Sequence, residues 1–144
     1  MYQKILTALD FSDNRRKVMD AALKLADNDA SKLHLVYVVH PITSGNDLSI
    51  YTKNIQAMED EALELATQKM AEFAAAENVP AGQVHTQLGD TAGEIRKIVA
   101  DIGADVIVIG SHGHSGKMRL LGATANKLLH GAKCDVLTVH ASDT

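Results

Sequence analysis

Residues 105–117 read DVIVIGSHGHSGK, and the order of residue types in this stretch decides the fold. Residues 106–109 are all β-branched, which is typical of a strand that is buried on both faces. Glycines follow at Gly110 and Gly113, and a helical segment then runs to His130. This order indicates either an anion-binding loop at the carboxyl end of a parallel strand or an ordinary glycine-rich turn.

Apolar segments alternate with helical patterns along the rest of the chain. The predicted strands cover residues 5–9, 33–39, 83–88, 105–109 and 135–140. Helices are predicted over residues 18–26, 54–77 and 95–102, and from Gly122-Ala123-Thr124 to His130. Alternation of this kind implies a single α/β domain over residues 1–144, with a parallel sheet, helices on both faces and right-handed crossovers.

The long predicted helix has one apolar face, formed by Ile55, Met58, Ala62, Leu65 and Phe73. Acidic and amide side chains lie opposite, so we expect the apolar face to pack on the sheet. Lys69 falls inside the apolar sector. We expect its aliphatic stem to lie along that face while its ammonium group reaches solvent.

Composition excludes several classes of function. The formal net charge is −4 and only 3% of residues are aromatic, which argues against a nucleic-acid partner. No apolar stretch approaches the roughly 18 residues of a membrane span, so we expect no membrane association. A single cysteine, Cys134, allows no disulfide within the chain. Without a secretory leader pattern at its start, the chain is expected to be cytoplasmic.

Three other α/β motifs fail at specific residues. A P-loop needs four residues between its glycines and a hydroxyl after its lysine, but Lys117 is followed by Met118. A dinucleotide fingerprint needs glycines after the first strand, and residues 8–12 contain none. A receiver domain needs adjacent acidic residues there, where only Asp10 is present.

Asp10 and Gly110 are the candidate ligand-binding positions, because each directly follows a predicted strand. Ligands of open α/β sheets bind outside the carboxyl ends of the strands, where the strand order reverses. A 3-2-1-4-5 order makes these two strand ends neighbours. The alternative for Asp10 is a cap at the start of the following helix.

The chain resembles the universal stress protein family over essentially its whole length. The resemblance is carried by residues 4–12, by Gly110-Ser111-His112-Gly113, by residues 122–126 and by residues 134–139. It implies a Rossmann-like fold of the adenine nucleotide alpha hydrolase-like type, with a five-stranded parallel sheet in the order 3-2-1-4-5. It also implies a homodimer through strand 134–140. That strand is predicted to be an exposed edge, which invites pairing with another chain.

In the nucleotide-binding branch of this family, the resemblance implies ATP or AMP, with or without Mg²⁺, held by the pattern G-x2-G-x8or9-G-[ST]. The residues that it places against adenine and ribose are Ala8, Asp10, Val38, Ile109 and Gly110. Those that it places around the phosphates are His112, Gly113, Gly122, Ala123 and Thr124. The sequence departs from the pattern at Ala123, where the pattern has Ser or Thr.

The resemblance therefore implies a stress-response regulatory protein, in which bound ATP or AMP modulates contacts with a second copy or with unidentified protein partners. The alternative is a nucleotide-independent stress-response dimer whose glycine loop is only scaffold. No catalytic residue can be named, so at most a weak ATPase activity is expected. His112 and His114 have no third metal-ligand candidate nearby, and no metal site is predicted.

Overall fold

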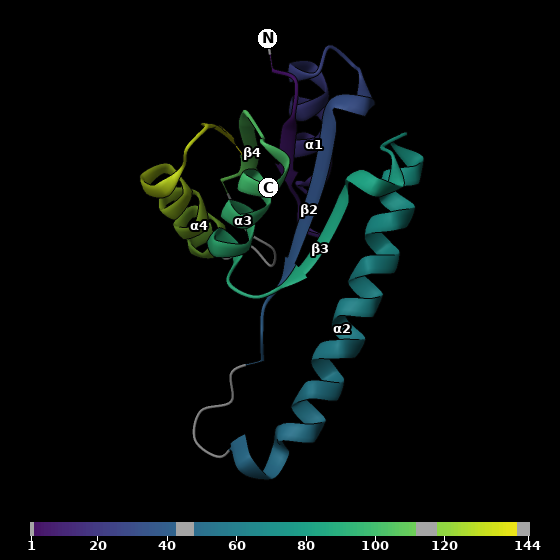
Figure 1. The fold of residues 1–144 in the computed structure, drawn as a ribbon, viewed down its shortest axis with the longest axis vertical. Coiled ribbons are helices and arrows are strands. Elements are labelled where there is room, and N and C mark those ends of the chain that lie inside the picture. The colour runs from purple at the N-terminus through teal and green to yellow at the C-terminus, as the bar shows by residue number, and fades with distance from the viewer. Residues whose placement is uncertain (1, 43–47, 112–117, 141–144) are drawn as a thin grey trace.

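The computed structural model describes residues 2–42, 48–111 and 118–140, with the backbone alone for 48–53 and 118–123. Its strands are β1 (Ile5–Ala8), β2 (Leu33–Val39), β3 (Val84–Leu88), β4 (Val106–Gly110) and β5 (Asp135–Val139). Its helices are α1 (Arg15–Leu25), α2 (Leu48–Ala76), α3 (Thr91–Ile102) and α4 (Met118–Gly131). Short 3-10 turns, η1 (Ala30–Lys32) and η2 (Ala81–Gln83), precede β2 and β3 (Figure 1).

The five strands form one sheet in the order β3-β2-β1-β4-β5, and every neighbouring pair is parallel. This confirms the predicted strand order. The central strand β1 lies between β2 and β4, with Ile5 opposite both Leu33 and Val106. Strand β5 is one edge of the sheet, as expected, and β3 is the other.

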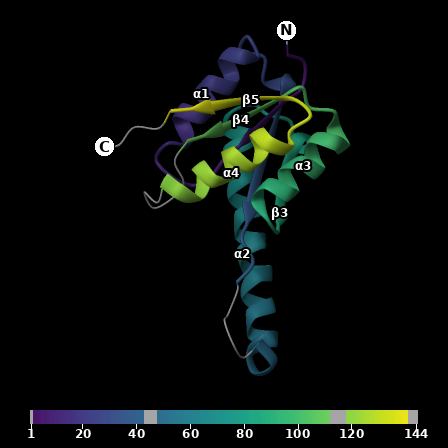
Figure 2. The ribbon, with the colours of Figure 1, turned by 90° about the vertical axis from the view of Figure 1, so that its left-hand side faces the viewer.

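Helices cover both faces of the sheet, and each face has its own core. Ile5 and Leu6 are successive residues of β1, and both are fully buried. Ile5 packs with α1 and α2, whereas Leu6 packs with α3 and α4. Because β1 and β4 are covered on both sides, their sequences are continuous apolar runs rather than alternating ones. Figure 2 shows α3 and α4 on one side of the sheet, away from α1.

Local signals account for both ends of α3. The Asp90 side chain accepts a hydrogen bond from the Gly93 N–H at 2.9 Å, which caps the start of the helix. The helix stops at Gly103, whose φ of +70° is left-handed and favours glycine. Helix α4 departs from expectation. It begins at Met118, so Gly122, Ala123 and Thr124 lie within it.

Helix α2 begins at Leu48, earlier than the expected residue 54, and extends beyond the sheet (Figures 1 and 2). Among its described side chains, residues 54–76, the buried ones are Ala66, Met70 and Ala74, all in the carboxyl-terminal half. The predicted packing of the apolar face was partly wrong. Met58 and Leu65 are 56% and 51% exposed, because they lie beside the stripe that contacts the sheet.

Lys69 is exposed, as expected, and its Nζ lies 5.3 Å from the centroid of the Phe11 ring. This cation–π contact ties α2 to the segment that follows β1. Despite the length of α2, none of the described helices is apolar enough over a sufficient length to cross a bilayer.

Candidate functional site

The carboxyl ends of β1 and β4 lie next to each other at the centre of the sheet. Ala8 is the register partner of Ile109, so the chain leaves both strands at the same level. From there, β1 leads to α1 on one face of the sheet, and β4 leads to α4 on the other face. This divergence defines the switch point where ligands bind in open α/β sheets. The expected proximity of the two strand ends is therefore confirmed.

Asp10 is half-buried, and its carboxylate organises the turn that follows β1. Its Oδ1 accepts hydrogen bonds from the N–H and the hydroxyl of Ser12, at 3.0 and 2.6 Å. The Ser12 Oγ in turn accepts the N–H of Asn14 at 3.2 Å. Helix α1 begins at Arg15, with Asn14 as its N-cap residue. Asp10 is thus not the cap of α1. Its second oxygen, Oδ2, accepts no hydrogen bond from the described residues.

The apolar candidates Ala8, Val38 and Ile109 belong to one core cluster, on the face that carries α3 and α4. Ala8 and Val38 retain 8% and 7% exposure at the carboxyl ends of their strands, whereas Ile109 is fully buried. The Ile109 side chain is therefore core. Only its backbone, with that of the buried Gly110, borders the strand end.

Several phosphate candidates of the sequence analysis cannot be placed. His112 and Gly113 lie outside the described residues. Gly122 and Ala123 are described only as backbone within α4. Thr124 is half-buried in the same helix.

Sequence reasoning missed two side chains at the same edge of the sheet. His40 directly follows β2, and its Nε2 lies 3.4 Å from the hydroxyl of Thr91, the first residue of α3. Both residues are positioned by the ends of β2 and β3. The signal that could have identified His40 is its position after a buried strand, the same signal that selected Asp10.

An aromatic and cationic cluster adjoins the Asp10 turn on the face that carries α1 and α2. The Phe11 ring lies 4.5 Å from the Tyr37 ring, between centroids, and 5.9 Å from the guanidinium carbon of Arg15. Arg15 also lies 4.7 Å from the centroid of Phe73. Burial, and secondarily the Asp10 carboxylate, raise the pKa of Tyr37. The cluster joins the segment before α1 to β2 and to α2.

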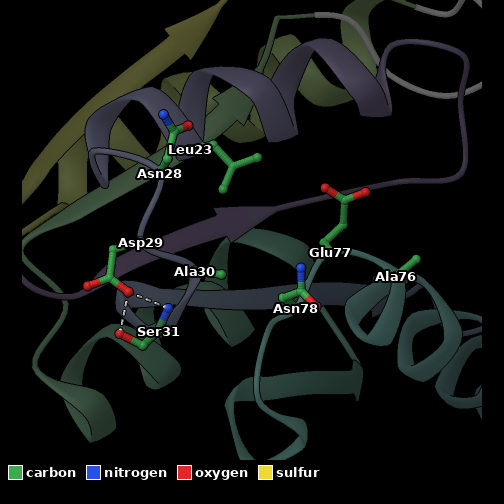
Figure 3. A pocket seen from close by; sticks show the side chains of 8 residues that line it. All are labelled: Leu23, Asn28, Asp29, Ala30, Ser31, Ala76, Glu77 and Asn78. Atoms are coloured by element: carbon green, nitrogen blue, oxygen red, sulfur yellow. Dashed lines mark hydrogen bonds between the residues drawn. The ribbon is translucent and has the colours of Figure 1, made fainter.

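A separate hollow of about 570 Å³ lies at the opposite end of the sheet, beyond the last turns of α1 and α2 (Figure 3). Its lining residues are Leu23, Asn28, Asp29, Ala30, Ser31, Ala76, Glu77 and Asn78. The carboxylates there are already paired. Asp29 accepts the N–H and hydroxyl of Ser31, and Glu77 forms a salt bridge with Arg16 at 2.7 Å. The carboxyl ends of β1 and β4 therefore remain the candidate functional site.

Metal and thiol chemistry find no support in the described parts of the chain. No three His, Cys, Asp or Glu side chains gather there in a group that could hold a metal ion. Burial raises the pKa of the Cys134 thiol. The thiol therefore stays protonated at neutral pH and is a poor nucleophile.

Comparisons with known proteins agree with the fold. The sequence model of the universal stress protein family matches residues 1–140. Universal stress protein A homolog 1 of Coxiella burnetii is 35% identical over 142 residues, which cover 96% of each chain. Among solved structures, hypothetical protein MJ0577 superposes with a TM-score of 0.80 at 24% identity, covering 100% of this chain and 99% of that one.

A universal stress protein in complex with cAMP superposes with a TM-score of 0.62 at 21% identity, covering 98% of this chain and 99% of that one. At such identities the two structural likenesses establish the shared fold.

Proposed function

Because the chain belongs to the universal stress protein family, we propose that it binds an adenine nucleotide, ATP or AMP, at the carboxyl ends of β1 and β4. One observation carries the proposal. The register of Ala8 with Ile109 brings the Asp10 turn and the Gly110 loop to one point, from which the chain diverges to opposite faces. The cAMP bound to a structurally similar member supports the class of ligand.

In the proposed complex, Asp10 accepts hydrogen bonds from the ribose hydroxyls. Its Oδ1 is held by two hydrogen bonds from Ser12, which orient the carboxylate before the ligand arrives. A hydrogen bond to a charged acceptor contributes about 1.5–3 kcal/mol. This preorganisation favours the role of Asp10, because little side-chain freedom remains to be lost on binding.

In the proposed complex, the adenine base and the phosphates contact different parts of the site at the carboxyl ends of the strands. Ala8 and Val38 offer apolar surface to adenine, and the backbone of Ile109 and Gly110 borders the sugar. We assign the phosphates to His112, Gly113, Gly122, Ala123 and Thr124, with Mg²⁺ held mainly by phosphate oxygens and water. We assign the backbone donor of this part of the site to Gly113, because glycine lets its N–H approach an anion closely. Residues 122–124 lie within α4, where their N–H groups belong to the helix.

We further propose that the protein forms a homodimer through β5 and that bound nucleotide modulates this contact. The described edge strand exposes 38% of Leu137. The Ser111 N–H, at the start of the glycine loop, donates to the Val139 carbonyl of β5 at 2.9 Å. This bond links the nucleotide loop directly to the proposed dimer strand, so ordering of the loop by phosphate stabilises the end of β5. We propose that contacts with other stress-response partners depend on the same nucleotide-bound state.

Calorimetric titration of the purified protein with ATP and with AMP tests the proposal. Gly113→Val should abolish measurable binding, because a branched Cβ occupies space that the phosphate needs. Gly82→Val is the matched control, since a Cβ at Gly82 meets nothing within 4 Å, and it should bind normally. Unchanged affinity in a folded Gly113→Val variant contradicts the phosphate assignment. No binding of either nucleotide by the wild type favours the nucleotide-independent alternative.

A further inference from the structure

The exposed part of α2 carries an apolar seam with the spacing of a coiled coil. We define this seam as Ile55, Met58, Ala62 and Leu65, which follow one another at intervals of three, four and three residues. This is the spacing of the a and d positions in a heptad, and it places all four side chains along one line of the helix. The seam therefore has the pattern of a helix that packs against a second helix.

The described part of the chain does not cover this seam. No side chain from residue 54 to residue 65 is buried, and Met58 and Leu65 are more than half exposed. The helix continues past the ends of β2 and β3, as Figures 1 and 2 show. Most of the stability of a helix in a protein comes from packing of its amphipathic face, so a partner on the seam would stabilise the exposed half of α2. Pairing through β5 does not provide one, because α2 packs on β2 and β3 at the other side of the sheet.

The charge around the seam specifies the chemistry of the partner. Four acidic side chains, Glu59, Asp60, Glu61 and Glu64, lie between residues 54 and 68, and Lys69 takes the next a position after Leu65. Only Glu59 and Glu61 flank the seam, at e and g, whereas Asp60 and Glu64 lie at f and c on the opposite face of the helix. Glu59 is half-buried and accepts the Ile42 N–H at 2.7 Å, whereas the other three are exposed. Glu61 immediately precedes Ala62 and occupies a g position, which in coiled coils faces the flank of the partner helix.

We propose that the α2 seam binds an amphipathic helix of another protein, whose apolar stripe is flanked by lysine and arginine. A basic flank is complementary to the acidic side chains beside the seam. An antiparallel second copy of α2 is disfavoured, because it sets e against e and g against g positions and so brings Glu59 and Glu61 each against its own counterpart. An anionic membrane surface is disfavoured because its charge has the same sign as these two side chains.

A labelled synthetic peptide serves as the probe, with leucine at a and d and lysine at e and g over about three heptads. A second peptide of identical composition, with its leucines moved off the heptad spacing, measures charge attraction alone. Fluorescence anisotropy without nucleotide keeps the result independent of the proposed ATP site. We expect the periodic peptide to bind the wild type at least about tenfold more tightly than the scrambled one.

Variants locate the site. The double variant Met58→Gln and Leu65→Gln should keep its fold, because both side chains are exposed, and should weaken the periodic peptide at least about tenfold. Leu129→Gln, which alters an exposed leucine on α4, should change nothing. Glu61→Gln should weaken binding at about 50 mM salt and have little effect at about 500 mM, whereas Glu64→Gln, on the opposite face of the helix, should have a smaller effect at low salt.

Four outcomes overturn the proposal. The first is equal affinity for the two peptides, and the second is undiminished binding by the Met58 and Leu65 double variant. The third is a wild-type oligomer that this double variant dissociates in sedimentation, which makes a second copy the occupant. Binding of anionic vesicles that the double variant abolishes also contradicts the proposal, since the seam is then a lipid surface.

Discussion

The Nδ1 atom of His34 on β2 lies 3.2 Å from the Nε2 atom of His85 on β3. The two rings are stacked, with centroids 5.4 Å apart and planes inclined by 18°. Burial lowers the pKa of both imidazoles, and the charge of His85, and then that of Lys4, lower the pKa of His34 further. Asp101 has a smaller opposite effect on His85. The hydrogen bond between these two nitrogens needs one of them without a proton. It is therefore lost only when both imidazoles are protonated.

The histidine pair makes stability depend on pH. Because both pKa values are lower in the folded protein, the unfolded chain binds more protons in acid. The free energy of unfolding should therefore be highest above the ordinary histidine pKa of about 6.5 and fall as the pH drops through the lowered values. Urea denaturation at a series of pH values between about 7.5 and 5 measures this slope.

A matched pair of variants isolates the effect. His85→Gln should flatten the slope, because it removes one of the two titrating rings and the repulsion on His34. His130→Gln, which changes an exposed histidine of α4, should leave the slope as it is. An equally steep slope in His85→Gln contradicts a role for the pair.

Thr7 has a buried hydroxyl that forms no hydrogen bond within the described structure. It lies on β1 between Leu35 and Val108, its register partners on the neighbouring strands. Replacing a hydroxyl by a methyl of similar shape removes an unsatisfied group, so Thr7→Val should raise the free energy of unfolding by about 1–2 kcal/mol. Thr7→Ser keeps the hydroxyl but loses the methyl group, so this variant should lower the free energy of unfolding. A destabilised Thr7→Val in urea denaturation shows that the hydroxyl does have a partner.

The backbone of β5 defines the sharpest test of the proposed dimer. The Asp135 N–H and the Val139 carbonyl bond to β4 and its loop, so the N–H and C=O of Thr138 point to the open edge. Thr138→Pro removes an outward N–H without breaking the sheet and should give a monomer. Thr138→Val retains that N–H and should still dimerise. Sedimentation equilibrium compares them, and a Thr138→Pro variant as dimeric as the control contradicts pairing through β5.

Ala123→Ser restores the hydroxyl that the nucleotide-binding pattern contains. If backbone N–H groups carry most of the phosphate recognition, this change adds about one hydrogen bond and tightens ATP binding by up to about tenfold. Ala100→Ser on α3 adds a hydroxyl to an exposed helical position elsewhere and should have no effect. Calorimetric titration of the three proteins provides the measurement. A gain far above tenfold means that the natural protein hardly binds ATP.

The sheet order could be predicted because the chain carries its signals locally. The apolar runs at residues 33–39 and 105–109 identify buried parallel strands, and Gly103 marks the end of α3. The candidate position of Asp10 follows from the same reasoning, since strand ends in such sheets converge. The hydrogen bonds between Asp10 and Ser12 could also have been predicted from the sequence, because an Asp followed two residues later by Ser favours an Asx turn.

Other features depend on contacts that the local pattern does not contain. The helical periodicity places Met58 and Leu65 on one apolar face of α2. It does not show whether the sheet covers that stripe or the adjacent one. The pairing of His34 with His85 depends on the register of β2 with β3, which aligns Leu35 with Val84. That register arises from packing over the whole sheet, so residues 51 positions apart meet without a local signal.

The separation of α2 from β5 has a consequence for avidity. Two chains joined through β5 leave both α2 seams free, because each seam lies on the β2 and β3 side of its own sheet. A partner that carries two basic helices then binds its second helix intramolecularly, which raises apparent affinity by about 10²–10⁴ without a new contact. When the two chains separate, that gain in affinity is lost although neither seam has changed. The apparent affinity for a bivalent partner therefore depends on whether the distant β5 strands are paired.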